Sequence, residues 1–267
     1  MSWRPFFILL VAAASFSTVS ASAQGNGSEV SVTLLSSTDR PRPGQTFLVG
    51  FRMIPKVGWH TYWSNPGESG IPASVRWQAP RELQFGAILH PAPTILNVAG
   101  MTNYVHAGEH VLLSRISVSS ALKPGTALPI KARLIWATCS ESLCVPQHAT
   151  FELHLVVGSG APNPATGLLK SAENRIPRSL PHGRFDVQHN FLRLRLPTIV
   201  RIDAKRASFF PDENEILVAS PLGLRVAQGQ TVILARWSGG SIPSRISGVL
   251  SDGQNGYRVS FSRESPR

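Results

Sequence analysis

Apolar and polar residues alternate along much of the chain, which is the pattern of half-buried β-strands. Near the start, Val30, Val32 and Leu34 alternate with polar residues. A Pro- and Gly-containing turn at residues 40–44 leads into a second apolar run at residues 46–53. A strand, a Pro-Gly turn and another strand are a frequent beginning of immunoglobulin-like sandwiches.

The same reasoning predicts roughly eight strands between residues 30 and 157, enough for one sandwich. Residues 100–110 contain two glycines and are expected to form a loop. The other strands expected in this half lie at residues 74–77, 83–88, 111–118, 128–136 and 149–157.

A Gly- and Pro-rich linker begins at residue 158, and residues 165–175 could form a short helix that ends before Pro177. Alternating and aromatic runs then predict a second β unit between residues 181 and 262. We therefore expect an all-β protein, with an immunoglobulin-like β-sandwich at residues 24–157, a linker at 158–180 and a second, smaller β domain at 181–267.

The first 23 residues predict a cleavable secretory signal peptide. Arg4 precedes a short apolar run at residues 6–14, and the small residues Ala21 and Ala23 form a cleavage site. The apolar run is short for a membrane span, so we expect an exported chain from Gln24 that is not integral to the membrane. Disulfides form and persist in exported proteins.

The formal net charge is +11. The basic residues are scattered singly and form no run interleaved with aromatic residues, as nucleic-acid surfaces usually do. We therefore expect no nucleic-acid partner. The charge is read as a solvated basic surface that favours solubility and weak attraction to acidic partners.

The chain contains two cysteines, Cys139 and Cys144. The four residues between them suit a hairpin loop, and strand-like sequence flanks them on both sides. In an exported protein this pair predicts a disulfide across a hairpin. The disulfide could be a structural staple or a reagent for thiol exchange.

Two physical arguments favour exchange. A loop this short stabilises a fold by only about 2 kcal/mol in the chain-entropy model, and two sandwich-sized cores should not need it. Bridges across a hairpin also tend to depart from relaxed geometry, which makes them easier to exchange. Glu141, His60 and His148 are candidate proton-transfer groups, although the pattern favours an ordinary surface or strand position for each histidine.

A second conspicuous stretch runs from Gly58 to Pro72, with Trp59, Tyr62 and Trp63 clustered around His60. In a strand, Trp59 and Trp63 share one face while His60 and Tyr62 share the other. These aromatic residues could form a sandwich core, or a rim that shields a reactive group or receives a partner.

Metal binding is the main rival chemistry, since His106, His110 and the two thiols could offer ligands to a soft ion such as Cu(I). Gly108 argues against a helix that would aim both histidines at one ion, and the chain has only three methionines. We therefore predict no metal and no other cofactor. The chain also contains no G-x-S-x-G or H-E-x-x-H motif for hydrolysis.

These stretches, taken together, resemble the periplasmic N-terminal region of the DsbD/ScsB family of membrane thiol:disulfide interchange proteins. The similarity runs from about residue 30 to residue 262. The motifs that carry it are Gly58–Trp63 with Asn65–Gly67, then Gly100–Tyr104, then Trp136 with Cys139–Pro146, and finally Ser208–Asp212.

The resemblance implies an immunoglobulin-like periplasmic module with Cys139 and Cys144 as its redox pair. It implies a cap loop at Asn103, Tyr104 and Val105, and we place an aromatic rim at Trp59, His60 and Tyr62. The partners would be a membrane-embedded electron donor and oxidised periplasmic proteins, each engaged through mixed disulfides.

The chain lacks the family's multi-helix membrane domain and C-terminal thioredoxin domain, so we expect a separate membrane protein to supply electrons. Protein-disulfide reductase activity stays open at this point. The alternative is a non-catalytic binding or copper-tolerance accessory module with a structural disulfide.

Overall fold

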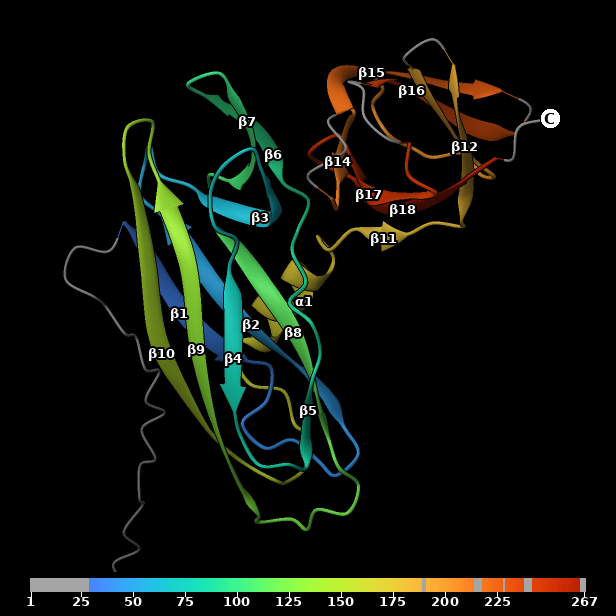
Figure 1. Cartoon of the computed structure of the whole chain (residues 1–267). Coiled ribbons are helices and arrows are strands. Elements are labelled where there is room, and N and C mark those ends of the chain that lie inside the picture. The colour runs from blue at the N-terminus through green and yellow to red at the C-terminus, as the bar shows by residue number, and fades with distance from the viewer. Residues whose placement is uncertain (1–28, 189–190, 214–217, 228, 238–241, 265–267) are drawn as a thin grey trace, which may run out of the picture.

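The structure is a computed structural model that describes residues 29–188, 191–213, 218–227, 229–237 and 242–264. The expected signal peptide lies outside the described residues. Figure 1 shows two β units joined by a short connection that contains a helix, α1 (Thr166–Glu173). No helix in the described ranges is both long and apolar enough to span a lipid bilayer.

The first unit is the predicted immunoglobulin-like sandwich. One sheet has the order β1 (Val30–Ser36), β2 (Thr46–Pro55), β8 (His110–Val118), β5 (Leu83–Phe85). The facing sheet has the order β10 (Cys144–Val156), β9 (Ala127–Cys139), β4 (Ser74–Gln78). A third, smaller sheet has the order β3 (Thr61–Gly67), β7 (Met101–His106), β6 (Thr94–Val98).

Alternation explains how the two large sheets close over one core. The predicted apolar face of β1 is buried at Val30, Val32 and Leu34. Strand β9 buries every second residue from Leu128 to Trp136, and these side chains meet those of β1 and β2 in one cluster. The alternating residues of β9 stay exposed on the other face, as expected for an antiparallel sheet with one solvated side.

The helix covers the outer face of the β2–β8 pair. Leu169 is fully buried against Leu48, Val111 and Leu113. Gly50 of β2 permits this close packing, because a Cβ atom there would come within 2.7 Å of side-chain carbons of Leu169 and Val111. The salt bridge between Arg115 and Glu173 also links α1 to β8.

The prediction of a loop at residues 100–110 was wrong. Residues 101–106 form β7, which pairs with β3 on one side and β6 on the other. Asn103, Tyr104, Val105 and His106 are all buried. Because both faces of β7 are covered, its sequence does not alternate between apolar and polar residues, and the strand pattern was missing.

The second unit is one strongly curved sheet with its own core. Its order is β14 (Ser208–Pro211), β17 (Arg245–Ser251), β18 (Gly256–Arg263), β12 (Gly183–Gln188), β13 (Phe191–Leu196), β16 (Gln230–Trp237), β15 (Val218–Ala227), and β11 (Arg178–Ser179) pairs with β18. The first and last strands of this order, β14 and β15, lie side by side, so the sheet rolls up on itself. Phe185, Phe209 and Phe261 fill the interior with aliphatic residues around them. The boundaries expected at residues 157 and 181 stay a prediction.

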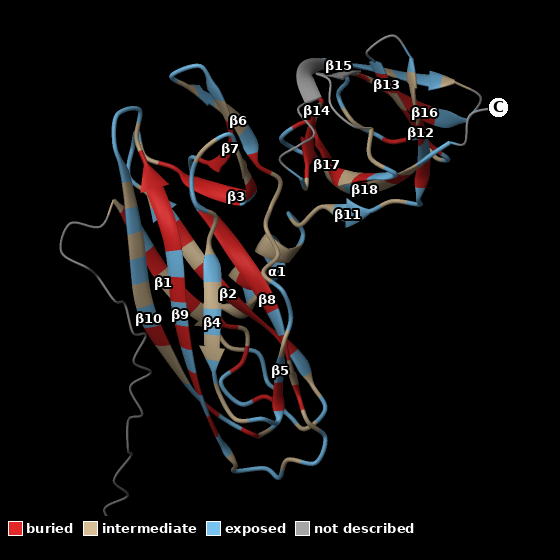
Figure 2. Cartoon of the chain, viewed as in Figure 1, coloured by how far each residue is buried: buried red, intermediate tan, exposed pale blue. Residues whose placement is uncertain are grey.

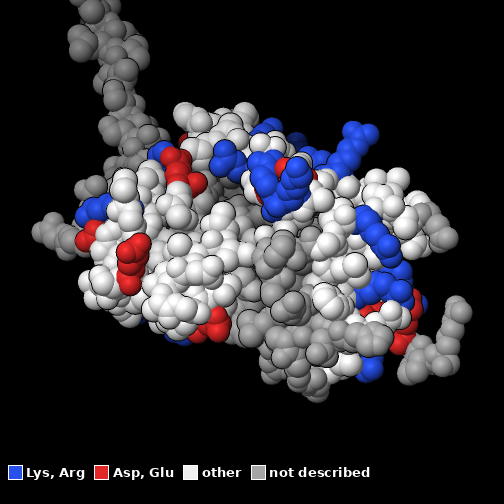
Figure 3. All heavy atoms as spheres, turned by 90° about the horizontal axis from the view of Figure 1, so that it is seen from above, with Lys and Arg blue, Asp and Glu red and all other residues white. Residues whose placement is uncertain are grey.

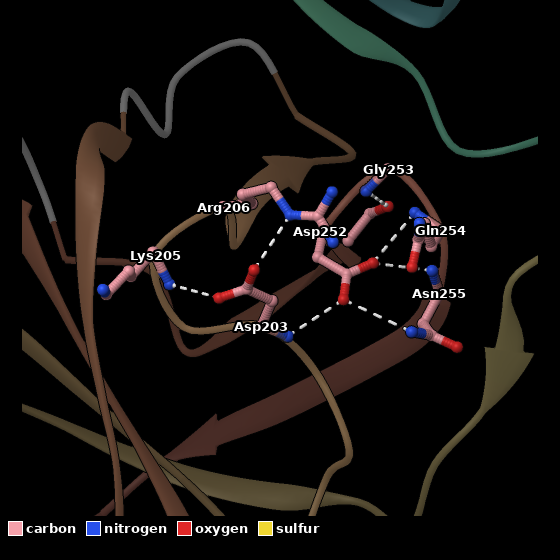
Figure 4. A network of polar contacts seen from close by, with 8 residues as sticks. Asp203, Lys205, Arg206, Asp252, Gly253, Gln254 and Asn255 are labelled. Carbon is pink, nitrogen blue, oxygen red and sulfur yellow. Dashed lines mark hydrogen bonds and ion pairs between the residues drawn. The ribbon is translucent and has the colours of Figure 1, made fainter.

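A network around Asp252 holds the turn between β17 and β18 (Figure 4). The carboxylate accepts hydrogen bonds from the backbone N–H groups of Asp203, Gln254 and Asn255, at 2.7–2.9 Å, and from the Asn255 side chain. Burial alone would raise the pKa of Asp252, but these hydrogen bonds outweigh it and lower the pKa to about 2.

Asp252→Asn is therefore expected to destabilise the protein at pH 7 by about 1–3 kcal/mol. The substitution replaces one acceptor oxygen by an N–H2 group, which cannot accept the hydrogen bonds of the backbone N–H groups in the turn. The native carboxylate has a depressed pKa, so its contribution is present above about pH 4 and is lost as the pH falls toward 2. Urea unfolding of both proteins at pH 7 and at pH 2.5 measures this. Equal stabilities at pH 7 would contradict the assignment.

Candidate functional site

The two cysteines end the longest hairpin of the first unit. Cys139 is the last residue of β9 and Cys144 the first of β10, and the two residues pair directly in the ladder. They form a disulfide with their Cα atoms 4.1 Å apart. Inside the turn, the Ser140 N–H donates to the Leu143 carbonyl at 2.8 Å. The predicted cross-hairpin disulfide is therefore confirmed.

The two sulfur-bearing residues differ sharply in exposure. Cys139 is 1% exposed, whereas Cys144 is exposed to solvent. Figure 2 shows the contrast along the hairpin, with the end of β9 buried and the turn beyond it exposed. Leu143 and Ile71 are also about half exposed. An incoming thiolate would therefore meet Cys144 first.

Strands β3 and β7 bury Cys139. The backbones of His60 and Cys139 form an isolated antiparallel bridge, with N–H···O distances of 2.9 and 3.0 Å in the two directions. Cys139 then packs in a small apolar cluster with Tyr62, Val105 and Ala137. The buried sulfur thus lies under a two-stranded cover that comes from a different part of the chain.

Tyr62 also reaches the exposed sulfur. Its hydroxyl lies 3.9 Å from the Sγ of Cys144, within range of a weak O–H···S hydrogen bond. Burial raises the pKa of Tyr62, so the phenol stays protonated at neutral pH and can donate. The His60 ring meets the Tyr62 ring edge-on at 5.3 Å, and burial lowers the pKa of His60. His60 is therefore neutral beside the disulfide at pH 7.

A loop rich in glycine and serine presses on Tyr62 from outside. Gly70 has φ of +98°, and a Cβ atom there would lie 2.2 Å from Tyr62 ring carbons. Asn103 holds this loop, since its Oδ1 accepts hydrogen bonds from the N–H and hydroxyl of Ser69 at 3.0 and 2.8 Å. Glycine is required at position 70 because both the backbone angle and the space exclude a side chain.

The residues of the expected aromatic rim take different positions. His60 and Tyr62 are buried beside the disulfide. Trp59 is half-buried in the turn before β3, where its backbone N–H donates to the Lys56 carbonyl. Tyr62 and Trp63 point to opposite faces of β3, and both faces are buried.

The three residues expected in the cap loop also separate. Val105 packs against Cys139, Tyr104 points to the opposite side of β7, and Asn103 holds the Ser69 loop. None of them lies in a loop, and of the three Val105 is the one that packs in the cluster with Cys139. Ser69, Gly70 and Ile71 were not predicted as part of the site. The Gly-Pro-rich stretch after Trp63 was the signal that could have indicated them.

The histidines considered as metal ligands lie elsewhere. The β7–β8 turn stacks the His106 and His110 rings at 4.5 Å, and His90 lies 6.1 Å from His106. The two rings therefore come together across a turn between two strands and not along one face of a helix. Within the described ranges, no three His, Cys, Asp or Glu side chains are grouped so that they could hold a metal ion. His106 and His110 border a groove of about 900 Å³ between β7, α1 and the β17–β18 turn.

Basic side chains are distributed over both units. On the face seen in Figure 3 they form separate groups, several of them beside acidic side chains, with uncharged surface between. Among the ion pairs of the second unit, Asp186 pairs with Arg193 and Arg195, and Arg195 also pairs with Glu264. The positive charge therefore forms no continuous band on this face of the described surface.

Comparison with known proteins gives a family match over the first unit. Residues 31–155 match the family described as "Thiol:disulfide interchange protein DsbD, N-terminal". No curated protein sequence matches the chain. Among solved structures, the N-terminal periplasmic domain of ScsB from Proteus mirabilis aligns with a TM-score of 0.67 and 17% identity, covering 91% of this chain and 97% of that one.

A chimeric titin Z1Z2 protein aligns over 89% of this chain and 97% of that one, with 10% identity. Its TM-score of 0.21 is too low to indicate a shared fold. The ScsB similarity includes the second β unit as well as the first, since it extends over most of both chains. Residues 31–155 therefore belong to the family of DsbD N-terminal domains of thiol:disulfide interchange proteins, and the chain as a whole has the fold of the ScsB periplasmic domain.

Proposed function

We propose that this protein is a periplasmic thiol:disulfide interchange module that passes electrons between a membrane-embedded donor and oxidised periplasmic proteins. Cys139 and Cys144 would alternate between disulfide and dithiol. The observation that carries the proposal is the unequal burial of the pair, with an exposed Cys144 bonded to a covered Cys139. The DsbD-family match supports the same chemistry.

The reducing half-reaction begins when a donor thiolate attacks the Sγ of Cys144. A mixed disulfide forms, the Cys139–Cys144 bond breaks, and Cys139 receives the electron pair as a thiolate that takes up a proton. The donor's second thiolate then attacks the donor's first sulfur, which is bonded to Cys144 in the mixed disulfide, and Cys144 is released as a thiolate. The donor is left as a disulfide and the module as a dithiol.

The second half-reaction runs the same chemistry toward an oxidised partner. The Cys144 thiolate attacks the partner's disulfide, and the Cys139 thiolate then resolves the mixed disulfide. The net result is a reduced partner, which amounts to protein-disulfide reductase activity. The Tyr62 hydroxyl, 3.9 Å from the Cys144 sulfur, would stabilise the Cys144 thiolate of the reduced module by donating a hydrogen bond.

The remaining site residues have supporting roles in this proposal. Trp59, His60 and Tyr62 would surround the pair as an aromatic rim. Asn103, Tyr104 and Val105 would keep β7 and the Ser69 loop against it. The signal peptide at residues 1–23 would direct the chain to the periplasm, and residues 181–267 would act as a supporting second domain.

The proposal is tested by equilibrating the oxidised protein with glutathione redox buffers and with reduced thioredoxin, a dithiol protein. Thiol alkylation followed by mass measurement gives the fraction reduced. We expect complete exchange and a reduction potential above about −300 mV, since structural disulfides lie below that value. A lower potential without exchange would favour the accessory module with a structural disulfide, which also predicts that the Cys139→Ala/Cys144→Ala protein keeps its function.

A further inference from the structure

Strands β3 and β7 of the third sheet, together the β3–β7 ribbon, lie between the disulfide and the second β unit. Successive residues of a strand point to opposite faces. Tyr62 and Val105, which pair directly in the ladder, pack against Cys139. Their chain neighbours Trp63 and Tyr104 point the other way and pack against Phe210 and Val249 of the second unit. Each strand therefore contacts the redox pair on one face and the second unit on the other.

Phe210 of β14 fills the space on the second face. Its ring lies edge-on to Tyr104 at 5.3 Å and to Trp63 at 6.2 Å. These three aromatic residues are each less than 5% exposed, and Val249 of β17 completes the cluster. Edge-on aromatic contacts of this kind contribute about 0.5–1.5 kcal/mol beyond the area that they bury.

A buried hydrogen bond fixes the same contact. The Asn65 side-chain amide donates to the Pro211 carbonyl at 2.8 Å, while its Oδ1 accepts the N–H of Gly67 at 2.9 Å. Asn65 is 3% exposed. The end of β3 is thereby tied to the residue that follows Phe210, which restricts how far the ribbon can move away from the second unit.

A single layer of strands separates these two contacts. The position of the β3–β7 ribbon against Cys139 therefore depends on the side chains that pack on its opposite face. We propose that Phe210 is a positioning residue for disulfide exchange. It keeps the β3–β7 ribbon pressed on Cys139 and so directs attacking thiolates to Cys144. The inference rests on the proposed function for the partner reaction, but the protection of Cys139 can be measured without any partner.

The test compares Phe210→Ala with Phe209→Ala in the reduced full-length protein. Phe209 is the adjacent residue of β14, equally buried, but its side chain packs into the core of the second unit. Both variants replace a buried phenylalanine by alanine, but of these two side chains only that of Phe210 packs against the ribbon. Mass spectrometry of peptides after timed iodoacetamide labelling gives separate alkylation rates for Cys139 and Cys144.

We expect Phe210→Ala to raise the alkylation rate of Cys139 by about tenfold, equivalent to about 1.4 kcal/mol in the free energy of local opening. The Cys144 rate should change less than twofold, and Phe209→Ala should leave the ratio of the two rates near its native value. An unchanged Cys139 rate in Phe210→Ala, or an equal rise in Phe209→Ala, would overturn the proposal.

If circular dichroism shows that an alanine variant has unfolded, Phe210→Leu and Phe209→Leu are decisive by the same criteria, with a smaller rise expected for Phe210→Leu. Exchange of the native protein with thioredoxin is a separate measurement. Failure of exchange would reject the proposed function, whereas failure of the labelling contrast would reject the role of Phe210.

Discussion

Cys139→Ala is expected to capture oxidised partner proteins, and Cys144→Ala to capture at least about tenfold less. In the first variant the remaining thiol is exposed at the hairpin turn. In the second, the remaining thiol is 1% exposed beneath Tyr62 and Val105. A thiolate must reach a partner's sulfur to attack it, so Cys139 can react only when the strands above it open locally. An opening free energy of about 1.4 kcal/mol already lowers the yield of the mixed disulfide tenfold.

The measurement uses each reduced variant with oxidised thioredoxin as the model partner, followed by non-reducing electrophoresis and mass spectrometry of the mixed disulfide. The Cys139→Ala/Cys144→Ala protein is the matched control and should form no adduct. Equal yields from the two single variants, or a higher yield from Cys144→Ala, would contradict the assignment of Cys144 as the attacking residue.

A marked loss of stability between about pH 6.5 and pH 4 is the second large effect expected. Burial lowers the pKa of His90 and of His110 to about 4, and lowers that of His106 well below its usual value. Charge on His110 also lowers the pKa of His90 and of His106, and charge on His90 lowers that of His106. The unfolded chain therefore binds protons below pH 6.5 that the folded protein does not, and folding weakens as the pH falls.

For His110 alone, the difference between pKa values of about 6.5 and 4 amounts to about 2 kcal/mol at pH 5. Two hydrogen bonds hold the neutral ring in place, since its Nδ1–H donates to the Gly108 carbonyl and its Nε2 accepts from Thr61. The bond to Gly108 favours the charged ring, but the effect of burial on the pKa is larger. Glu109 beside it favours the charged ring, but that carboxylate is bound to Arg52 at 2.8 Å. Arg175 also borders the groove that His106 and His110 line.

Urea unfolding at pH 7.5, 6, 5 and 4.5 measures the slope of stability against pH. His106→Gln should make the slope shallower because a neutral amide replaces one titrating ring. His154 is the matched control, since its side chain is 78% exposed and His154→Gln should leave the slope unchanged. A native protein with constant stability over this range would show that the three rings do not control acid stability.

Several features of the fold could be predicted from local patterns alone. The alternation at Val30, Val32 and Leu34 placed one face of β1 in the core, because the period of two is a property of the extended chain itself. The spacing of Cys139 and Cys144 likewise predicted their pairing across a hairpin turn. Both predictions depended on residues close together in the chain.

Strand β7 could not be predicted in that way. Its two faces are covered by segments distant in the chain, the Cys139 cluster on one side and Phe210 on the other. A strand buried on both sides need not alternate, and Asn103 and His106 inside it resembled loop residues. The same long-range cover decides that Tyr62 and Trp63 are both buried.

The sequence by itself determined that two thiols meet at a hairpin turn in an all-β chain, because turn length and alternation act over a few residues. Only the tertiary structure decided that the two sulfur-bearing residues are unequal. Cys139 is covered by β3 and β7, and Phe210 supports these strands from behind. Burial is set by contacts between segments that fold together from far apart, as with Asn65 and Pro211, and no local pattern records which of two paired cysteines will be covered.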